Sequence, residues 1–296
     1  MRLWPCLLLA AGSLPAQFSD YWHQGKAEVN RYEIERQRYG AMRPGYAVLI
    51  FVTEDLLRDK QVKDERGAGD QAVNVLKLNR IERFTTGLYD YSLMQSVFTE
   101  AMPTGSDLPA TLKSTTSIQD WCGHVWLQAN RRGRGFETVS HSYFENEADE
   151  RATLPLALLE DEVFTQIRLG AERLPVGELQ VIPSAFRVRL DHRPLRAEKA
   201  SASLVDLPRT PGNDVAEREY RLTIQLGNNE ARSLRVRFAK AFPFVITAFE
   251  ERFEKGDATT VIFRAVLQKT ERIDYWTKNQ PRDDALRAEL GLPPAR

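Results

Sequence analysis

The sequence is dominated by strand-length runs in which apolar and polar residues alternate, joined by short turns rich in glycine and asparagine. One example runs through 220–226, turns at the Gly-Asn-Asn of 227–229 and returns through 234–238. Such alternation places one face of each strand on a core, and hairpin-length links join antiparallel neighbours. There are roughly a dozen such runs, more than a flat sheet holds without curling, closing or splitting.

Other parts of the chain complete the expected fold. A run that is apolar on both faces, at 46–53, predicts a strand covered on both sides. One apolar stripe of helical period occupies 156–169, between Pro155 and Gly170, and a short helix is predicted at 283–290. Further strands are predicted at 73–84, 88–98, 186–190, 195–205, 244–253 and 259–269, and an edge-like strand is predicted at 26–38. We therefore predict a mainly β protein with a strongly curved, half-open antiparallel sheet, one packed helix and a short C-terminal helix.

The N-terminus predicts export. A short positive start, Met1-Arg2, precedes an apolar stretch at 3–11 and a small-residue segment at 12–16. These three regions are typical of a secretory signal peptide, here cleaved near Ala16, so the protein is expected in the periplasm or outside the cell. No later run is long and apolar enough to predict a membrane span. Residues 17–296 are interpreted as a single β-rich domain, with a subdivision near 175–183 as the alternative.

Charge and cysteine content narrow the functional classes. The chain has 296 residues with 41 basic and 41 acidic side chains, so its formal net charge is zero. A nucleic-acid-binding surface would require a basic excess, and none is expected here. Of the two cysteines, Cys6 lies in the predicted signal peptide and Cys122 remains in the mature chain. A single cysteine excludes a disulfide within the mature protein.

The segment 117–147 concentrates the reactive side chains and is predicted to form a hairpin around the polar turn 130–135. If the turn is symmetric about Arg132 and Gly133, His124 faces His141 and Cys122 lies two positions along the same face. The opposite face is then expected to be a core face. It would carry Trp121, Val125, Leu127, Phe136 and Phe144.

Three interpretations of this cluster stay open. A thiolate beside an imidazole, as in Cys122 with His124 or His141, is the minimum for a cysteine nucleophile. The two histidines with Cys122 or Glu145 could instead hold zinc or copper, although no cofactor is expected as the default. In the structural interpretation Cys122 is a small buried apolar residue and the histidines bond to neighbouring hydroxyls. The common sequence motifs of hydrolases, nucleotide-binding loops and zinc proteases are absent.

Four stretches carry a resemblance to a known group of proteins. They read YWHQGKAEVNRYE, AVLIFVTEDL, DWCGHVW and HSYFENEAD. Together they resemble an uncharacterised family of exported bacterial proteins, some of them labelled septum formation inhibitor Maf, over most of the mature chain. The Maf nucleotide pyrophosphatases have a Ser-rich N-terminal phosphate motif followed by paired arginines, which this chain lacks. The resemblance therefore implies export and supplies no catalytic residues.

The leading hypothesis is a non-enzymatic, exported binding protein for an apolar small molecule or a protein partner. It depends on the β pattern, the export signal and the missing catalytic motifs, because curved sheets commonly enclose such ligands. Peripheral association with the cell envelope is compatible with this hypothesis. The alternative is a metal-dependent or cysteine/histidine hydrolase that uses Cys122, His124 and His141.

Overall fold

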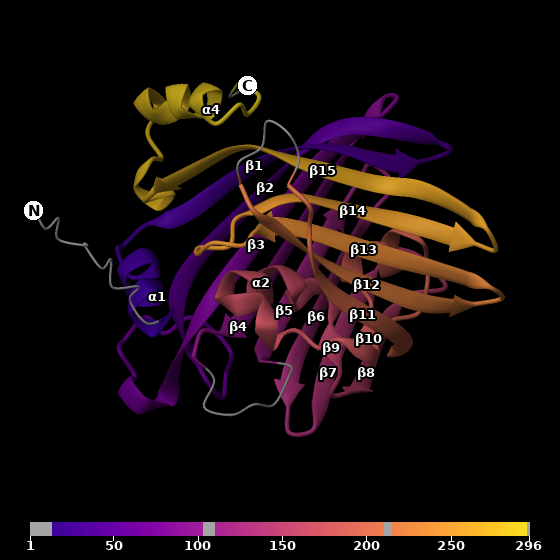
Figure 1. Ribbon diagram of the computed structural model, residues 1–296, viewed down its shortest axis with the longest axis horizontal. Helices are drawn as coiled ribbons and strands as arrows, with labels where there is room; N and C mark the ends of the chain where they lie inside the picture. The colour runs from indigo at the N-terminus through magenta and orange to yellow at the C-terminus, as the bar shows by residue number, and fades with distance from the viewer. Residues whose placement is uncertain (1–13, 103–109, 210–214, 295–296) are drawn as a thin grey trace, which may run out of the picture.

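The computed structural model describes residues 14–102, 110–209 and 215–294, and these form one large, curved sheet with a few short helices (Figure 1). In this part of the chain the sheet has 15 strands. They are β1 (Ala27–Arg38), β2 (Ala41–Leu57), β3 (Ala72–Thr86), β4 (Tyr89–Glu100), β5 (Thr111–Gln119), β6 (His124–Arg132), β7 (Gly135–Ser142), β8 (Asp149–Pro155), β9 (Leu158–Leu159), β10 (Gly177–Ile182), β11 (Glu198–Asp206), β12 (Glu217–Gly227), β13 (Glu230–Ala239), β14 (Ile246–Lys255) and β15 (Ala258–Ile273). The α-helices are α1 (Leu14–Trp22), α2 (Val163–Gly170), α3 (Ala185–Leu190) and α4 (Ala285–Glu289).

Sequential strands pair with each other, except β8 and β9, and β1 also pairs with β15. The order across the sheet runs from β8 down to β1, then from β15 down to β9. Every pairing is antiparallel except that of β9 with β10. β1 and β15 therefore join two meanders in the middle of the sheet, with Ala27 opposite Ile273. The prediction of an edge-like strand at 26–38 is wrong, because β1 pairs with β2 on one side and β15 on the other.

The two outer edges of the sheet, β8 and β9, are consecutive in the chain. β8 ends at Pro155 and β9 begins at Leu158, so only two residues connect opposite edges. Three Cα steps reach at most about 11 Å, which forces the sheet to curl until its edges nearly meet. Leu154 of β8 and Leu159 of β9 share one buried apolar cluster across this seam. The sheet is thus barrel-like and not closed by hydrogen bonds.

The predicted fold class is confirmed. The predicted hairpins at 73–98, 220–238 and 244–269 are present as β3–β4, β12–β13 and β14–β15. Their turns carry residues suited to left-handed backbone, such as Gly87 at φ 61° and Gly256 at φ 55°. Local alternation and turn chemistry therefore predicted these strand pairs correctly.

Two predicted elements are wrong in type or extent. The helix predicted at 156–169 begins only at Val163, because Leu158 and Leu159 pair with β10 and a 3₁₀ turn follows at Glu160–Glu162. The strand predicted at 186–190 is helix α3. Phe186 and Leu190 are one helical turn apart and both pack in one core cluster, a spacing that a helix satisfies as well as a strand does.

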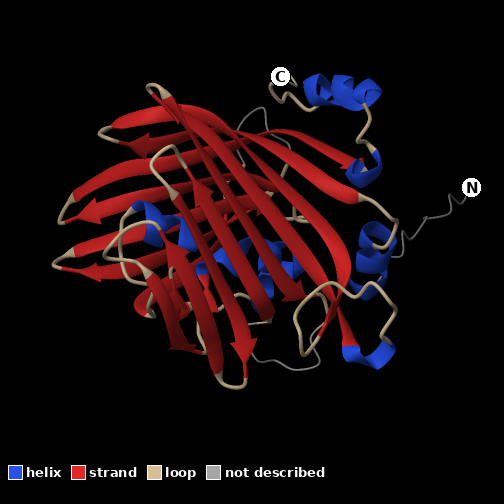
Figure 2. Cartoon of the chain, turned by 180° about the vertical axis from the view of Figure 1, so that it is seen from behind, coloured by secondary structure: helices blue, strands red, loops and turns tan. Residues whose placement is uncertain are grey.

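Helix α2 lies on the concave side of the sheet, and all of its residues are buried (Figures 1 and 2). Phe164 meets Phe249 of β14 edge-to-face, with ring centroids 5.0 Å apart. Thr165 is 2.6 Å from Thr99 of β4, between their hydroxyl oxygens. The helix therefore contacts both halves of the sheet and fills the interior of the curve.

The interior also contains buried ion pairs. Nη2 of Arg36 on β1 lies 2.6 Å from Oε2 of Glu82 on β3, and both side chains are fully buried. Oε2 of Glu251 on β14 lies 3.3 Å from Nε of Arg187 on α3 and 3.8 Å from Nη1 of Arg232 on β13. Burial opposes ionisation of Glu251, but these arginines outweigh it and lower its pKa below the usual range.

The chain's first residues and its suggested subdivision bear on domain organisation. The predicted signal peptide falls mostly in residues 1–13, outside the described residues. Helix α1 follows, and its Phe18 and Trp22 pack into the main core.

Residues 177–182, at the suggested subdivision, form β10 of the same sheet. None of the described helices is long and apolar enough to cross a membrane.

Candidate functional site

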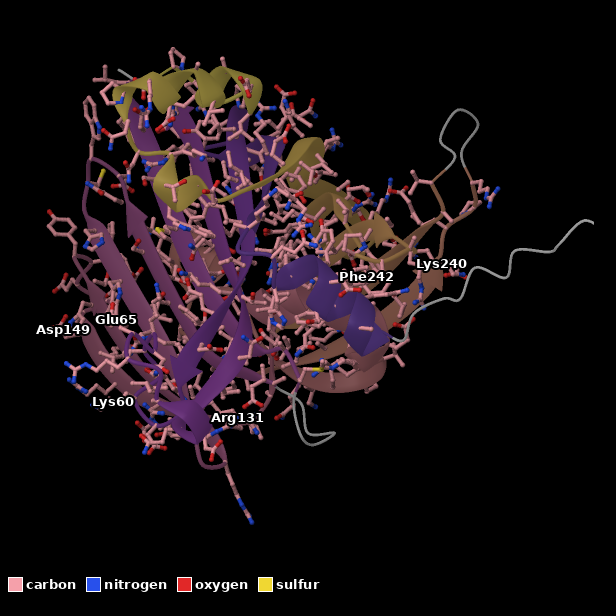
Figure 3. The ribbon with its side chains drawn as sticks, turned by 90° about the vertical axis from the view of Figure 1, so that its left-hand side faces the viewer. Lys60, Glu65, Arg131, Asp149, Lys240 and Phe242 are labelled. Carbon is pink, nitrogen blue, oxygen red and sulfur yellow. The ribbon has the colours of Figure 1, made fainter. Side chains whose placement is uncertain are left out.

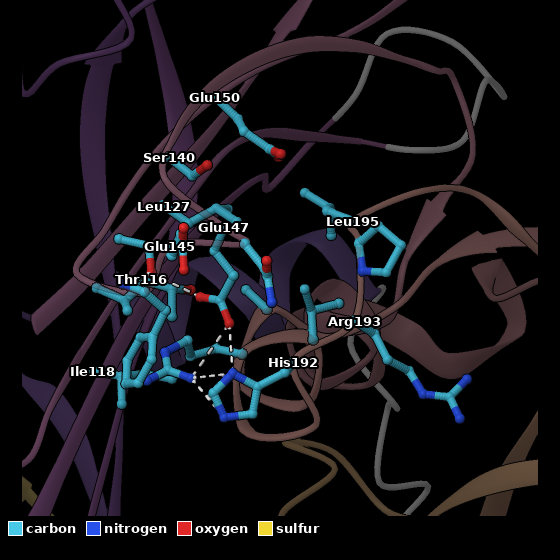
Figure 4. Close-up of a pocket in the computed structure, with 18 residues that line it drawn as sticks. Thr116, Ile118, Leu127, Ser140, Glu145, Glu147, Glu150, His192, Arg193 and Leu195 are labelled. Carbon is cyan, nitrogen blue, oxygen red and sulfur yellow. Dashed lines mark hydrogen bonds and ion pairs between the residues drawn. The ribbon is translucent and has the colours of Figure 1, made fainter. Parts of the chain in front are cut away.

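A pocket of about 490 Å³ lies between the concave face of β5, β6 and β7 and helix α3 (Figure 4). Alternation along the strands points every second side chain of the sheet into it. The apolar part of its wall comes mainly from Ile118, Val125, Leu127, Phe144, Val188 and Leu195. A concave, largely apolar space of this size with a few polar groups is typical of small-molecule binding sites.

The polar groups of the pocket gather where the β7–β8 loop meets the end of α3 (Figure 4). Oε1 of Glu147 lies 2.6 Å from Nδ1 of His192, which assigns the ring proton to Nδ1. Nη1 of Arg189 lies 3.1 Å from Nδ1 and 3.3 Å from Nε2 of the same ring, so the guanidinium is close to both ring nitrogens. His192 follows the end of α3 and has a left-handed backbone conformation, with φ 52°. This conformation turns the imidazole ring back toward the β7–β8 loop.

Arg189 connects this polar group to the aromatic wall. Its guanidinium carbon lies 3.8 Å from the ring centroid of Phe144, a cation–π contact. Burial lowers the pKa of Arg189 from its ordinary value, although the charge of Glu147 opposes the shift. Nη1 of Arg189 is 3.6 Å from Oε1 of Glu147. The loop and α3 are therefore held together by one carboxylate shared between an arginine and a histidine.

These side chains do not form a catalytic triad. Oγ of Ser142 donates to Oε2 of Glu147 at 2.8 Å, and Glu147 also accepts from His192. In a Ser–His–carboxylate triad the imidazole is the immediate base of the serine, and the carboxylate stands behind the imidazole. Here the carboxylate stands between the hydroxyl and the ring. The order of these groups therefore differs from that of a Ser–His–carboxylate triad, and Glu147 links the β7–β8 loop to α3.

A buried carboxyl lies directly behind the pocket wall. Asp161 accepts a hydrogen bond from the backbone N–H of Ala185, which lines the pocket, at 3.3 Å. Burial raises the pKa of Asp161 to about 6, and the neighbouring charge of Glu160 adds to the shift. Oδ1 of Asp161 has no hydrogen-bond partner among the described residues. This group is therefore able to change its charge state close to neutral pH.

The predicted hairpin at 117–147 is present, but its register is wrong. Trp126 faces His141, whereas the symmetric turn predicted Val139 at that position. The turn is centred one residue later than assumed: Arg132 pairs with Gly135, and Gly133 takes φ 51°. Glycine at the first central position favours this two-residue turn. The resulting shift is two residues, so the side chains within β6 and β7 keep the faces that were predicted for them.

The structure places the four candidate residues, Cys122, His124, His141 and Glu145, in different parts of the hairpin region. His124 and His141 share the outer face of the sheet as diagonal neighbours, because His141 pairs with Trp126, two positions along β6 from His124. The rings of His141 and Trp126 stack with centroids 5.8 Å apart. Nδ1 of His141 pairs with Asp149 at 3.0 Å. Cys122 lies in the β5–β6 turn, and only Glu145 lines the pocket. Across residues 14–102, 110–209 and 215–294, no three histidine, cysteine or acidic side chains are grouped to hold a metal ion.

Most of the predicted core face of the hairpin is buried or lines the pocket, whereas Cys122 is exposed. Val125 and Phe136 are buried and Leu127 and Phe144 line the pocket, so the predicted core face is confirmed for them. Trp121 is 69% exposed, because β5 ends at Gln119 and leaves this residue in the turn. The structural interpretation of Cys122 as a buried apolar residue is wrong, since this cysteine is free and exposed.

Exposure of Cys122 leads to a chemical prediction. Iodoacetamide at pH 8 should label native protein at Cys122 as readily as it labels urea-unfolded protein, because access to the thiol does not require unfolding. Mass spectrometry of tryptic peptides measures the labelled fraction. The Cys122→Ser variant should lose that label and keep its far-UV circular dichroism spectrum. Labelling of Cys122 that appears only in urea would contradict the exposed turn.

Sequence reasoning missed three of the polar pocket residues, Glu147, Arg189 and His192. They are brought together by α3, which was interpreted as a strand, and Glu147 and His192 are 45 positions apart in the chain. A local signal for the helix does exist. Arg187 and Asp191 have the four-residue spacing of a helical ion pair, and they pair at 2.7 Å.

Comparisons with known proteins give a limited result. No family model matches the chain, and no curated protein is significantly similar to it. One solved structure with a similar arrangement is described as a beta-barrel-like protein of domain of unknown function DUF1849 from Brucella abortus. It has 10% sequence identity and a TM-score of 0.44, and the match covers 83% of this chain and 98% of that chain. The fold assignment therefore rests on the strand pairing of this chain itself.

Proposed function

We propose that this protein is a binding protein that holds a small, mainly apolar ligand between β5–β7 and α3. The observation that carries the proposal is the 490 Å³ pocket with apolar walls. Burying a ligand's apolar surface against such walls contributes about 25 cal/mol per Å², which supplies the affinity. The polar group of Glu147, Arg189 and His192 at one end would orient the ligand.

The chemistry of the pocket favours binding over catalysis. Ser142 and His192 both bond to Glu147, so the described lining residues do not show the Ser–His–carboxylate order of a catalytic triad. The charged side chains at the loop are already paired with each other, so a ligand that covers them removes little further water from unpaired charges. Their polar atoms can still orient the bound ligand. The predicted signal peptide adds that the binding protein would act in the periplasm or outside the cell.

Filling the pocket should abolish ligand binding. Ser140 and Val139 are adjacent on β7 and point to opposite faces, and only Ser140 lines the pocket. We expect Ser140→Phe to weaken binding of N-phenyl-1-naphthylamine, an uncharged fluorescent probe, at least tenfold, since its ring occupies the space. Fluorescence titration of the purified protein gives the dissociation constants.

Val139→Phe is the matched control, because it adds the same ring to the outer face of the same strand. It should bind the probe as the wild type does. Equal affinity of both variants, with the wild type binding the probe, would place the probe elsewhere. A wild type that does not bind the probe or any co-purified apolar compound, tested by native mass spectrometry, would overturn the proposed function.

A further inference from the structure

Four successive turns at one end of the sheet each expose a large apolar side chain. β1, β3, β5 and β7 run in the same direction, so the segments that follow them lie at the same end. Tyr39 is 59% exposed, Leu88 81%, Trp121 69% and Tyr143 71%. Such exposure at four consecutive tips is unusual for side chains that water solvates poorly, and contiguous apolar patches mark interaction sites.

Contacts between the tips make these side chains one surface, here named the aromatic rim: Tyr39, Leu88, Tyr89, Trp121 and Tyr143. The hydroxyl oxygens of Tyr39 and Tyr91 are 2.9 Å apart, and Tyr91 lies 5.8 Å from Tyr89 between ring centroids. The ring of Tyr89 lies 6.3 Å from that of Trp121. The tip carrying Trp121 continues to Gly123, where an added Cβ would lie 2.7 Å from the ring of Tyr143.

The rim reaches the ligand pocket. Tyr143 packs edge-to-face on Phe144, with ring centroids 5.5 Å apart, and Phe144 lines the pocket. Phe144 in turn meets His192 edge-to-face at 5.2 Å. The exposed ring of Tyr143 is therefore in direct contact with a residue of the pocket wall.

The composition of the rim indicates what covers it. Tyrosine and tryptophan combine an apolar ring with a polar edge, and they are enriched where membrane and water meet. The side chains stand on convex tips from four separate turns, which suits a deformable surface better than a rigid partner. Asp90, Asp120 and Glu145 lie at these tips and Arg38 lies over the ring of Tyr39, so the rim has no basic excess that would attract anionic lipids. At the opposite end, Lys60 and Glu65 lie in the charged loop between β2 and β3 (Figure 3), and exposed apolar side chains there come from separate segments, such as Val176 and Trp276.

We propose that the aromatic rim docks the protein onto the interfacial layer of a zwitterionic phospholipid membrane. Docking stabilises the bound state by burying the exposed apolar surface of the rim, so its strength follows apolar area and not salt concentration. This surface is distinct from the pocket, and vesicle binding and ligand binding can be lost separately.

Vesicle co-sedimentation tests the proposal, with vesicles of phosphatidylcholine alone and vesicles with added phosphatidylglycerol. Wild type should bind both to a similar extent, with little change in 0.5 M sodium chloride. Leu88→Ser/Trp121→Ser should weaken binding at least tenfold. Both side chains are largely exposed, so this variant should keep its fold and its N-phenyl-1-naphthylamine affinity measured without vesicles.

The control removes the same kinds of side chain at the other end of the sheet. Val176 is 61% exposed and Trp276 46%, and Val176→Ser/Trp276→Ser should bind vesicles as the wild type does. The proposal fails if wild type does not bind vesicles, which would leave the rim to a protein or carbohydrate partner. It also fails if both double variants bind equally, or if binding requires phosphatidylglycerol and disappears in salt.

Discussion

Replacing Arg168 by methionine is expected to cost about 3–5 kcal/mol of unfolding free energy, because it leaves a buried carboxylate without its cation. Arg168 of α2 and Glu28 of β1 are both fully buried, with Nη2 and Oε2 2.7 Å apart. Tyr21 and Asn30 also donate to Glu28, but neither supplies a positive charge. Urea unfolding followed by circular dichroism measures the loss.

The second half of this test is the double variant Glu28→Gln/Arg168→Met. Removing the charge of Glu28 should recover a large part of the lost stability, since an uncharged pair costs less to bury. Arg264→Met is the control: Arg264 pairs with Glu35 at 3.4 Å, with both side chains about half exposed, and should lose less than about 1 kcal/mol. A similarly small loss for Arg168→Met would contradict the assigned role of the pair.

Asp161→Asn is expected to stabilise the protein above pH 6. The pKa of Asp161 is raised to about 6 in the folded protein from 3.8, so the folded state binds the proton more tightly than the unfolded state. Its contribution to stability is fully present below pH 3.8 and is lost as the pH rises through 6. At 1.36 kcal/mol per pKa unit, the loss by pH 8 is about 3 kcal/mol.

Asparagine stays neutral, so the variant should exceed wild type in stability at pH 8 and lose this advantage by pH 4. Urea unfolding midpoints at a series of pH values provide the comparison. Asp257→Asn, in the exposed β14–β15 turn, should follow the wild-type profile throughout. If Asp161→Asn and wild type differ by the same amount at every pH, Asp161 does not titrate in this range.

The sequence predicted the strands and most hairpins because their signals are local. Turn residues such as Asn228 and Asn229, at φ 52° and 57°, lie next to the alternating runs that they connect. The start of α2 could not be predicted in the same way. β9 pairs in parallel with β10, which follows more than twenty positions later, and this pairing outweighs the helical periodicity of 156–169.

The candidate site shows the same division. The inner face of β6 and β7 was identified by alternation, and Val125 and Leu127 do line the pocket. The rest of the pocket depends on where α3 crosses that face, which no local pattern specifies. Cys122, His124 and His141 were candidates because their side chains are reactive. The fold places Cys122 in a turn and the two histidines on the outer face of the sheet.

The pairing of β1 with β15 has a consequence for how the protein is made. As the chain emerges from its N-terminus, β1 to β8 can pair in order, each with the strand before it. One edge of β1 then stays open until β15, the last strand, has been synthesised. Open strand edges invite intermolecular pairing and aggregation, which charged side chains suppress. β1 carries two exposed glutamates, Glu33 and Glu35. Their charges would oppose pairing of this open edge with another chain until β15 has been synthesised.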